Sequence, residues 1–557
     1  MKKFNVLEPV KSFKMKIQYK YHILAVALIF CAGMLPAQDN AILSAVKSEV
    51  ERNRSGLKID KLKPPFFIKY TVVDLKSLHV SASLGSILRS MENSQKVGFS
   101  NLLVGDYDRN NANFRQNNFP RNVVVENDAR GIATTVWEDL DGMYKNAAEN
   151  YEAKVAVIAQ QNMEEEELNL PDFDKTAPLT MILEPPKMNM DRAYWENVAI
   201  KASEILKKYP EILNSAVNIN ITDPVIYSYS TENTSLRVPD PYYCMNIYLY
   251  TLTEDGQELS DELYIEHGSF EQMPSLQAFI DTCEAFVKYF IELKNAPIIT
   301  EAYTGPVLFE GMAVPEALQT YFFQSTLIAS RKPVGGQGGN NTEMMKDKKL
   351  TSRSLTIKSL SGTNMYKGKK LDGYYPVDAE GVVPDRELVL VENGVLRNML
   401  NGRTPTKKFR HSNGHMRVNL NYMNQRVGPG NVLLTSNDTY SPDELRKKLL
   451  AAAKEEDLDY AYTVRRYRGN GPLSIYRIYV ADGREELLRG AVLPDFNIKS
   501  FKRVLGASDR ELFYNTHMFG NFSTYIVPSG LLFEEMEVSR NNNITFKKPF
   551  AVPQPKW

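Results

Sequence analysis

Residues 303–311 read Tyr-Thr-Gly-Pro-Val-Leu-Phe-Glu-Gly and open the second half of the chain. They follow Asn295-Ala296-Pro297, where a long apolar helical stripe ends, and they precede a stretch that predicts a helix over 314–330. Proline ends a helix because it has no backbone N–H to donate. Pro297 therefore predicts a boundary between two domains.

Before Pro297 the pattern mixes helices and strands, so residues 38–297 are expected to form a mixed α/β domain. The turn Glu254-Asp255-Gly256 predicts a hairpin. Helices are predicted at 41–54, 133–167, 191–208 and 276–291, and strands at 66–74, 78–84, 97–105, 217–221, 225–230, 243–253 and 263–267.

After Pro297 the chain consists mostly of short strands and turns, and residues 298–557 are expected to form a β-rich domain with helices at 314–330 and 441–456. Residues 331–350 contain a glycine-rich run and have almost no apolar side chains, which predicts a mobile loop. No Gly-Lys-Ser/Thr follows that run, so it is not a phosphate-binding loop. The expected fold class is α+β in two domains.

Residues 1–37 have the layout of a signal peptide. A lysine-rich leader precedes an apolar run of 13 residues, from Ile23 to Leu35, which is shorter than the roughly 20 that a membrane-spanning helix needs. Ala37 offers a cleavage point, and Met15 is an alternative start. Cys31 as a lipid anchor is disfavoured because bulky Phe30 precedes it. A periplasmic or extracellular, soluble protein is therefore expected.

The charge balance and the cysteine content disfavour several classes of protein. The chain has 67 basic and 67 acidic side chains, and no long Lys/Arg block follows the leader, which disfavours a nucleic-acid partner. No other apolar stretch approaches the length of a membrane span. Cys244 and Cys283 are too few for a disulfide scaffold, and whether they form a bridge stays open.

Eight short segments recur in a characteristic order along the chain, at 104–107, 137–141, 303–311, 378–382, 391–396, 412–417, 482–490 and 528–536. Taken together, in this order and spacing, they resemble the TldD/PmbA family over nearly the whole mature chain. The resemblance implies a two-domain fold whose β-rich C-terminal domain carries a cleft for an extended peptide.

Active members of that family carry His-Glu-x-x-x-His on the helix after the Gly-Pro-Val-Leu segment, and a cysteine near the C-terminus. Zinc in a peptidase needs three protein ligands and one open position for water. The corresponding positions here are Gln319, Thr320 and Gln324, and no cysteine follows Cys283. These side chains are poor zinc ligands, and threonine cannot serve as the carboxylate base. The resemblance therefore implies a degenerate metal site.

Other catalytic arrangements are also disfavoured. His411 and His415 are four residues apart, but Ser412-Asn413-Gly414 between them predicts a turn and not a helix. By resemblance, Asn413, Gly414, His415 and Arg417 are candidate cleft residues, with His415 positioning a loop. Gly-x-Ser-x-Gly is absent, and Cys283 lies on the buried stripe of its helix.

Three hypotheses follow for the function. The first is an exported, non-catalytic subunit without a cofactor, which binds an extended peptide or pairs with a related chain as a homo- or heterodimer. The second is a zinc-dependent metallopeptidase whose ligands come from unrecognised positions or from a partner chain. The third is a structural envelope protein without a ligand.

Export gives a first testable prediction. N-terminal sequencing of the protein purified from cells should start close to Gln38, because the signal peptide is removed at Ala37. An intact leader on the cytoplasmic protein would contradict the prediction.

Overall fold

The computed structural model describes residues 41–115, 120–161, 163–336, 338–467, 473–518 and 520–548. The expected signal peptide, its alternative start Met15, Cys31 and the proposed cleavage point lie outside the described residues. No helix among the described residues is long and apolar enough to cross a membrane.

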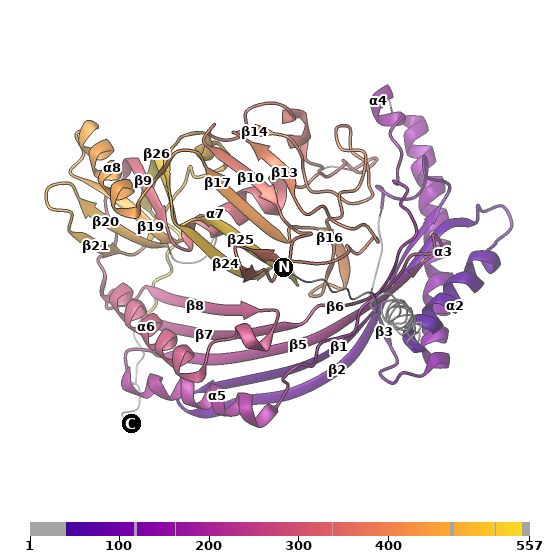
Figure 1. Cartoon of the computed structure of the whole chain (residues 1–557), viewed down its shortest axis with the longest axis horizontal. Helices are drawn as coiled ribbons and strands as arrows, with labels where there is room; N and C mark the ends of the chain where they lie inside the picture. Colours follow the sequence, from indigo (N-terminus) through magenta and orange to yellow (C-terminus); the bar gives the residue numbers. More distant parts are fainter. Residues whose placement is uncertain are drawn as a thin grey trace, which may run out of the picture.

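The N-terminal half is built on one eight-stranded sheet, which Figure 1 shows as a long curved band beneath the C-terminal half. Its order is β3-β2-β1-β5-β6-β4, and β7 pairs with both β5 and β8. The strands are β1 (Pro65–Ser83), β2 (Ser86–Val104), β3 (Arg121–Val123), β4 (Thr180–Ile182), β5 (Asn214–Ser230), β6 (Ser235–Pro239), β7 (Tyr242–Leu252) and β8 (Glu258–His267). The expected hairpin at Glu254-Asp255-Gly256 joins β7 to β8.

Two strands are longer than the sequence pattern predicts. The predicted strands 66–74 and 78–84 form the single strand β1, and the predicted strands 217–221 and 225–230 form the single strand β5. The pattern breaks at Lys76 in β1, where the side chains before it and those after it pack in two different core clusters, and at Pro224 in β5. Pro224 lies where β5 exchanges its neighbour β7 for β6, which is a position that tolerates the missing N–H.

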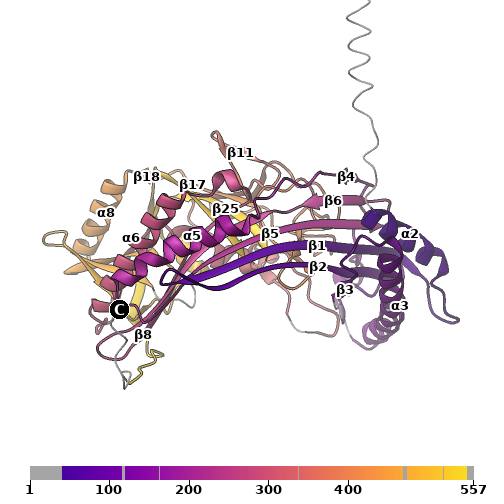
Figure 2. The same cartoon turned by 90° about the horizontal axis from the view of Figure 1, so that it is seen from below.

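Helices cover one face of this sheet at both of its ends. Near one end lie α2 and α3, and near the other lie α5 and α6, which cross in front of the strands in Figure 2. The predicted helix 133–167 is in fact two helices. The elements are α2 (Ala41–Gly56), α3 (Ala129–Gln160), α4 (Glu165–Leu168), α5 (Arg192–Glu204), α6 (Leu276–Asn295) and the 3-10 turns η1 (Ile205–Lys208) and η2 (Phe270–Gln272).

The other face of the sheet packs against the C-terminal half. Successive side chains of a strand point to opposite faces. In β1 the even-numbered Tyr70 and Val80 lie under the helices, whereas the odd-numbered Val73 packs with Val418 and Met423 of the C-terminal half. The sheet is therefore the middle layer of the molecule.

The C-terminal half has two main sheets, as expected for a β-rich domain. One is ordered β14-β13-β10-β17-β25-β24 and the other β18-β23-β26-β9-β19-β20-β21, with β22 on β26. The strands are β9 (Tyr303–Glu310), β10 (Leu355–Ser359), β11 (Met365–Tyr366), β12 (Lys369–Lys370), β13 (Leu388–Glu392), β14 (Val395–Leu396), β15 (Met416–Asn419), β16 (Asn424–Val427), β17 (Asn431–Ser436), β18 (Thr439–Tyr440), β19 (Tyr460–Arg466), β20 (Ser474–Tyr479), β21 (Glu485–Leu488), β22 (Ala491–Val492), β23 (Val504–Ser508), β24 (Glu511–Met518), β25 (Asn521–Pro528) and β26 (Gly530–Arg540).

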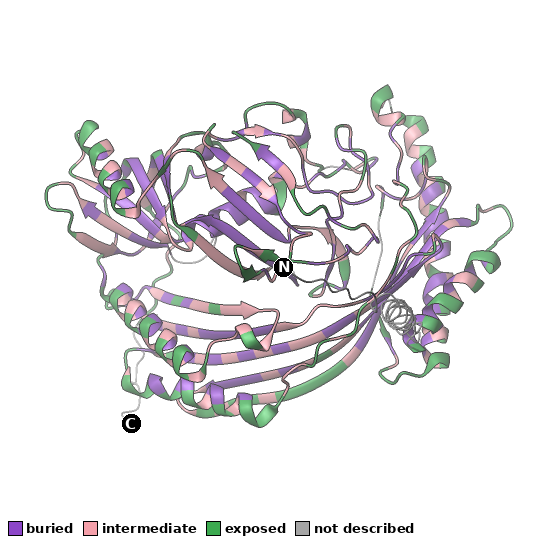
Figure 3. Cartoon of the chain, viewed as in Figure 1, coloured by how far each residue is buried: buried purple, intermediate pink, exposed green. Residues whose placement is uncertain are grey.

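Few helices accompany these strands. They are α7 (Ala313–Leu318), the π-helix η3 (Gln319–Thr326), the 3-10 helices η4 (Asn341–Met345) and η5 (Ile498–Lys502), and α8 (Pro442–Glu455), which starts with a capping box between Ser441 and Glu444. Figure 3 shows the central strands mostly buried, with exposed residues along the outer side of α8. The fold is α+β, as the sequence predicts.

Each named strand pairs only with strands on its own side of Pro297. This pattern agrees with the division into 38–297 and 298–557, which stays a prediction until the two parts are tested separately.

The segment 331–350, which its composition predicts to be a mobile loop, makes several polar contacts with the rest of the chain, and its mobility stays a prediction. Buried Arg331 contacts the carboxylate of Asp172, and the Asn340 side chain donates to three backbone carbonyls. Glu343 accepts a hydrogen bond from the backbone of Lys408. The contacts are made by polar side chains, so a count of apolar residues cannot detect them.

The two halves meet through a buried cluster of charges. The guanidinium of Arg403, from the C-terminal half, donates to both carboxylate oxygens of Glu232, each at 2.7 Å. It also stacks on the ring of Phe173, 4.0 Å from the centroid. Beside it, Lys69 of β1 donates to the backbone oxygen of Ala379. Burial lowers the pKa of Lys69, so this amine is held in place at a cost in solvation.

Replacing Arg403 tests this connection. Arg403→Met should destabilise the protein by about 3–5 kcal/mol, because the nearly buried Glu232 carboxylate loses its bidentate partner. Urea unfolding would measure the change. The control Arg397→Met removes a cation that also contacts two carboxylates, Asp347 and Glu392, but is exposed, and should leave the unfolding midpoint unchanged. Equal effects of the two substitutions would contradict the prediction.

Candidate functional site

Strand β9 carries the quoted 303–311 segment through the middle of a C-terminal sheet, between β26 and β19. Gly305 has no room for a side chain, since a Cβ there would lie 2.6 Å from Leu458 and 2.8 Å from the Tyr303 hydroxyl. After β9 the chain turns and enters α7, with Pro315 in its first turn, where a missing N–H costs little.

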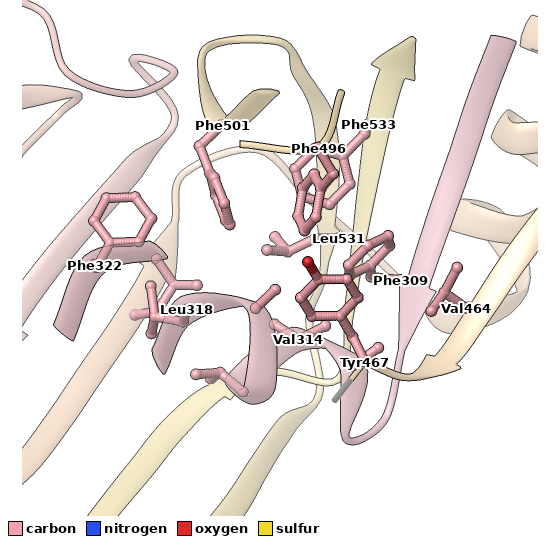
Figure 4. Close-up of a cluster of buried hydrophobic side chains, with 14 of the residues drawn as sticks. Phe309, Val314, Leu318, Phe322, Val464, Tyr467, Phe496, Phe501, Leu531 and Phe533 are labelled. Carbon is pink, nitrogen blue, oxygen red and sulfur yellow. The ribbon is translucent and has the colours of Figure 1, made fainter. Parts of the chain in front are cut away.

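One side of α7 is fixed by a large aromatic core. Figure 4 shows Val314, Leu318 and Phe322 directed toward rings from distant strands and loops. Phe322 meets Phe501 with ring centroids 4.9 Å apart, and Phe309 of β9 meets Phe496 at the same separation. This packing holds the opposite side of the helix in a defined position.

The helix changes type where the metal-site positions begin. The predicted helix 314–330 is α7 followed by the π-helix η3, which ends at Thr326. A π-helix has i to i+5 hydrogen bonds, so residues five apart lie on one face, and such turns are frequent at functional sites. Gln319 and Gln324 are five apart. The backbone thus keeps the geometry that an i, i+5 ligand pair would need.

Gln319, Thr320 and Gln324 line a cavity of about 1120 Å3 between the two halves of the molecule. The C-terminal half contributes α7, η3, β24 and nearby loop residues to its wall, and the first sheet contributes β1, β5, β7 and β8. The lining residues are Leu75, Asn220, Thr222, Tyr242, Tyr264, Glu266, Met312, Glu316, Gln319, Thr320, Tyr321, Gln324, Leu420, Asn421, Tyr467, Tyr514, Asn515, Thr516 and His517.

The side chains at the expected metal positions do not fit zinc. Two amides and a hydroxyl replace two imidazoles and a carboxylate, and the Thr320 hydroxyl already donates to the Glu316 backbone oxygen at 2.8 Å. Glu266, Glu316 and His517 also line the cavity, but within the described ranges no three His, Cys, Asp or Glu side chains are grouped as metal ligands would be.

His517 and Glu266 are held by neighbours from both halves. Glu266 accepts from the Tyr242 hydroxyl at 2.8 Å and from the His517 backbone N–H at 3.1 Å. The His517 ring stacks on Tyr242 with centroids 3.9 Å apart. Burial, followed by the charge of Arg417, lowers the pKa of His517 to about 3, so this imidazole is neutral at physiological pH.

The other candidate cleft residues lie elsewhere, since Asn413, Gly414, His415 and Arg417 are not among the residues that line the 1120 Å3 cavity. The Arg417 guanidinium stacks on Tyr375, 3.9 Å from the ring centroid. Gly414 has a φ of +76°, and a Cβ there would lie 2.8 Å from the Pro384 nitrogen, so this tight turn requires glycine.

His415 is a buried hydrogen-bonding residue. Its Nε2 lies 2.9 Å from the Ser359 hydroxyl, and its Nδ1 lies 2.8 Å from the Asn413 carbonyl oxygen. Burial lowers the pKa of His415 to about 3, which keeps the ring neutral. His411 is exposed and its Nδ1 lies 3.2 Å from Asp174, so the two histidines have separate partners.

The two cysteines are free and buried on opposite faces of the first sheet. Cys283 lies on the buried side of α6 and packs in the core. Burial raises the pKa of its thiol to about 12, which suits packing and not nucleophilic attack. Burial also raises the pKa of Cys244.

Sequence reasoning missed the half of the cavity that the first sheet supplies. Tyr242, Tyr264 and Glu266 come from β7 and β8, far in sequence from η3. The alternation of side-chain direction along these strands could indicate which residues share a face of the sheet. It could not indicate that this face lies opposite η3. The segment 514–517 of β24 lacks a recognisable motif as well.

Comparison with known proteins identifies the fold family. The family model of the PmbA/TldA metallopeptidase C-terminal domain matches residues 302–540. The chain carries a C-terminal domain of the TldD/PmbA family. Its C-terminal β-rich half is therefore a PmbA/TldA-type domain, and the match begins shortly after Pro297. No curated protein sequence matches the chain.

Solved structures of the same fold extend over both halves. A candidate modulator of DNA gyrase from Bacteroides thetaiotaomicron has a TM-score of 0.58 and 11% identity, covering 91% of this chain and 100% of that one. TldE from Thermococcus kodakarensis has a TM-score of 0.56 and 13% identity, covering 89% and 100%. A candidate modulator of a DNA gyrase from Thermotoga maritima has a TM-score of 0.55 and 14% identity, covering 88% and 99%.

The buried His415 makes stability depend on pH. In the unfolded chain the His415 side chain binds a proton near pH 6.5, whereas in the native protein it does so only near pH 3. Between these pH values the unfolded state therefore binds more protons than the native state. Stability should therefore fall as the pH drops from 6.5, by at most about 1.4 kcal/mol per pH unit from this residue. Urea unfolding from pH 7.5 to 5 should show a smaller slope for His415→Gln than for the unmodified chain.

The exposed His411 provides the control, because His411→Gln should leave the slope of stability against pH unchanged. An unchanged slope in His415→Gln would contradict the assignment of a buried, neutral ring.

Proposed function

We propose that this chain is an exported, non-catalytic member of the TldD/PmbA family that binds extended peptides in the cavity between its two halves. One observation carries the proposal. The π-helix η3 presents Gln319, Thr320 and Gln324 to a cavity of about 1120 Å3, so the position and shape of a site are present without metal-binding side chains.

The edge of a sheet supports peptide binding at this place. Strand β24 is the last strand of its sheet, and Asn515, Thr516 and His517 line the cavity. The His517 N–H donates to Glu266, so it points away from the paired strand β25. Alternate residues of an antiparallel strand direct their backbone groups to the same side, so the Asn515 backbone also points outward. Such an edge can pair with an added strand through main-chain hydrogen bonds.

The side chains support binding without cleavage. Hydrolysis by a zinc peptidase needs a polarised water on the metal and a carboxylate to accept its proton. Gln319 and Gln324 offer amides in place of imidazoles, and Thr320 cannot accept the proton. In addition, no cysteine follows Cys283 to act as the third ligand. Pairing with a related chain that keeps an intact motif would give such a subunit a role in hydrolysis.

Binding without hydrolysis can be tested on the purified mature protein. A fluorescently labelled, unstructured peptide should bind and stay intact during prolonged incubation with or without zinc. Thr320→Trp should weaken binding about tenfold or more, because the indole occupies the cavity. Thr439→Trp places the same side chain at an exposed site on β18 and should leave the affinity unchanged.

Metal content is the second measurement in this test. Mass spectrometry should find no stoichiometric zinc, and the triple substitution Gln319→His, Thr320→Glu, Gln324→His should bind zinc only weakly because the third ligand is missing. One tightly bound zinc per unmodified chain, together with cleavage that a chelator abolishes, would establish a metallopeptidase and overturn the proposal.

A further inference from the structure

A second space lies on the same face of the first sheet as the 1120 Å3 cavity. Alternate residues of β1 point toward the C-terminal half. Of these, Lys69 and Thr71 line a pocket of about 330 Å3, whereas Leu75 lines the 1120 Å3 cavity. Four residues of a strand span roughly 13 Å, so the pocket and the cavity are close neighbours along β1.

The β15–β16 hairpin separates these two spaces. It forms a two-stranded sheet of its own, and in Figure 1 it projects from the C-terminal half toward the first sheet. Val73, which lies between Thr71 and Leu75 on the same face of β1, packs against Val418 and Met423 of this hairpin. The wall between the pocket and the cavity is therefore one hairpin thick.

The tip of the hairpin connects one space to the other. Leu420 and Asn421 line the cavity, and Asn424 and Gln425 line the pocket. Tyr422 lies between these two pairs, and its side chain is 66% exposed. A ligand that followed the hairpin from the cavity to the pocket would pass this exposed ring.

Amide side chains surround the smaller pocket from three elements of the fold. They are Asn101 on β2, Asn146 and Asn150 on α3, and Asn424 and Gln425 on β16. Asn150 donates to the Asn146 oxygen at 2.8 Å, and within the described part of the chain these five side chains make no other hydrogen bond. Most of their donors and acceptors are thus available to a ligand.

The charged groups at the base of the pocket already have partners. Lys69 donates to the backbone oxygen of Ala379, and Glu380 accepts from the backbone N–H of Arg403 at 2.7 Å. Arg115, the other charged residue of the lining, is exposed. The pocket therefore suits a neutral ligand that carries several hydrogen-bonding groups.

The main chain of a peptide is such a ligand. A side-chain amide has the same donor and acceptor as a peptide group, so the two can pair through two hydrogen bonds at once. An extended chain presents its N–H and C=O groups along both of its sides, where amides from several elements can reach them. An aliphatic ligand would instead leave the amides without partners, which is costly.

We propose that an extended peptide bound in the 1120 Å3 cavity continues over the hairpin tip, beside Tyr422, into the 330 Å3 pocket, where asparagine and glutamine side chains bind its main chain. This inference rests on the proposed peptide-binding function and adds a second subsite to it. Because the contacts are with the main chain, the second subsite depends on the length of the peptide and not on its sequence.

Peptides of different length test the second subsite. A labelled, unstructured peptide is compared with the same peptide extended at either end by about six alanine residues, which is roughly 20 Å of extended chain. Fluorescence polarisation should show that one of the two extended peptides binds about tenfold more tightly than the short one. N-methylation of the added residues removes their N–H donors and should abolish most of this gain.

Variants of the protein locate the gain. Asn101→Leu and Gln425→Met keep the size of the side chain but remove the amide, so each should reduce the gain severalfold while the short peptide binds as before. Tyr422→Ala, at the exposed tip, should also reduce it. The control is Asn93→Leu, at an exposed position of β2 outside both spaces, and it should leave the gain unchanged. Thermal unfolding shows whether each variant is folded.

The outcomes separate this inference from the proposed function. If neither extension increases the affinity, if the N-methylated extension is as effective as the unmodified one, or if Asn101→Leu and Gln425→Met keep the full gain, the second subsite is wrong while peptide binding in the cavity stands. If neither the short nor the extended peptides bind to the folded protein, both the second subsite and the proposed function are overturned.

Discussion

The two-sided first sheet is the constraint on which the rest of the molecule depends. Strands β1 and β5 are long and bury side chains on both faces, so neither face can be left to solvent. Helices at the two ends cover one face, and the C-terminal half covers the other. Because the covering surfaces are not fully complementary, a large space remains between them, and that space is the candidate site. The site is therefore a product of how the halves meet.

Local patterns predicted much of the fold, including α2, α6, α8, the β7–β8 hairpin and the β-rich second half. The errors have identifiable physical causes. Lys76 interrupts the apolar pattern between the two core clusters of β1, and Pro224 interrupts it where β5 exchanges β7 for β6, so each continuous strand resembles two strands. In both strands the missing information concerned a partner distant in sequence.

The candidate site was predictable only on its C-terminal side. The position of the family's metal motif relative to the Gly-Pro-Val-Leu segment indicated Gln319, Thr320 and Gln324. These three residues line one cavity. The π-helix that places Gln319 and Gln324 on one face is not evident from residue propensities, since it depends on the aromatic packing of α7 and Phe322. Asn413 to Arg417 form a buried turn away from that cavity, where Gly414 and His415 maintain the local backbone.

The face of the first sheet that meets the second half also has a consequence for biosynthesis. This face carries Val73, Val97 and Phe99, which become buried only against Val418 and Met423. A ribosome completes the strands of the first half long before it reaches these covering residues. Until then the nascent chain exposes these apolar side chains beside unpaired strand edges, which is the kind of surface that aggregates. The order of the two halves thus delays the covering of this part of the face until the second half has been made.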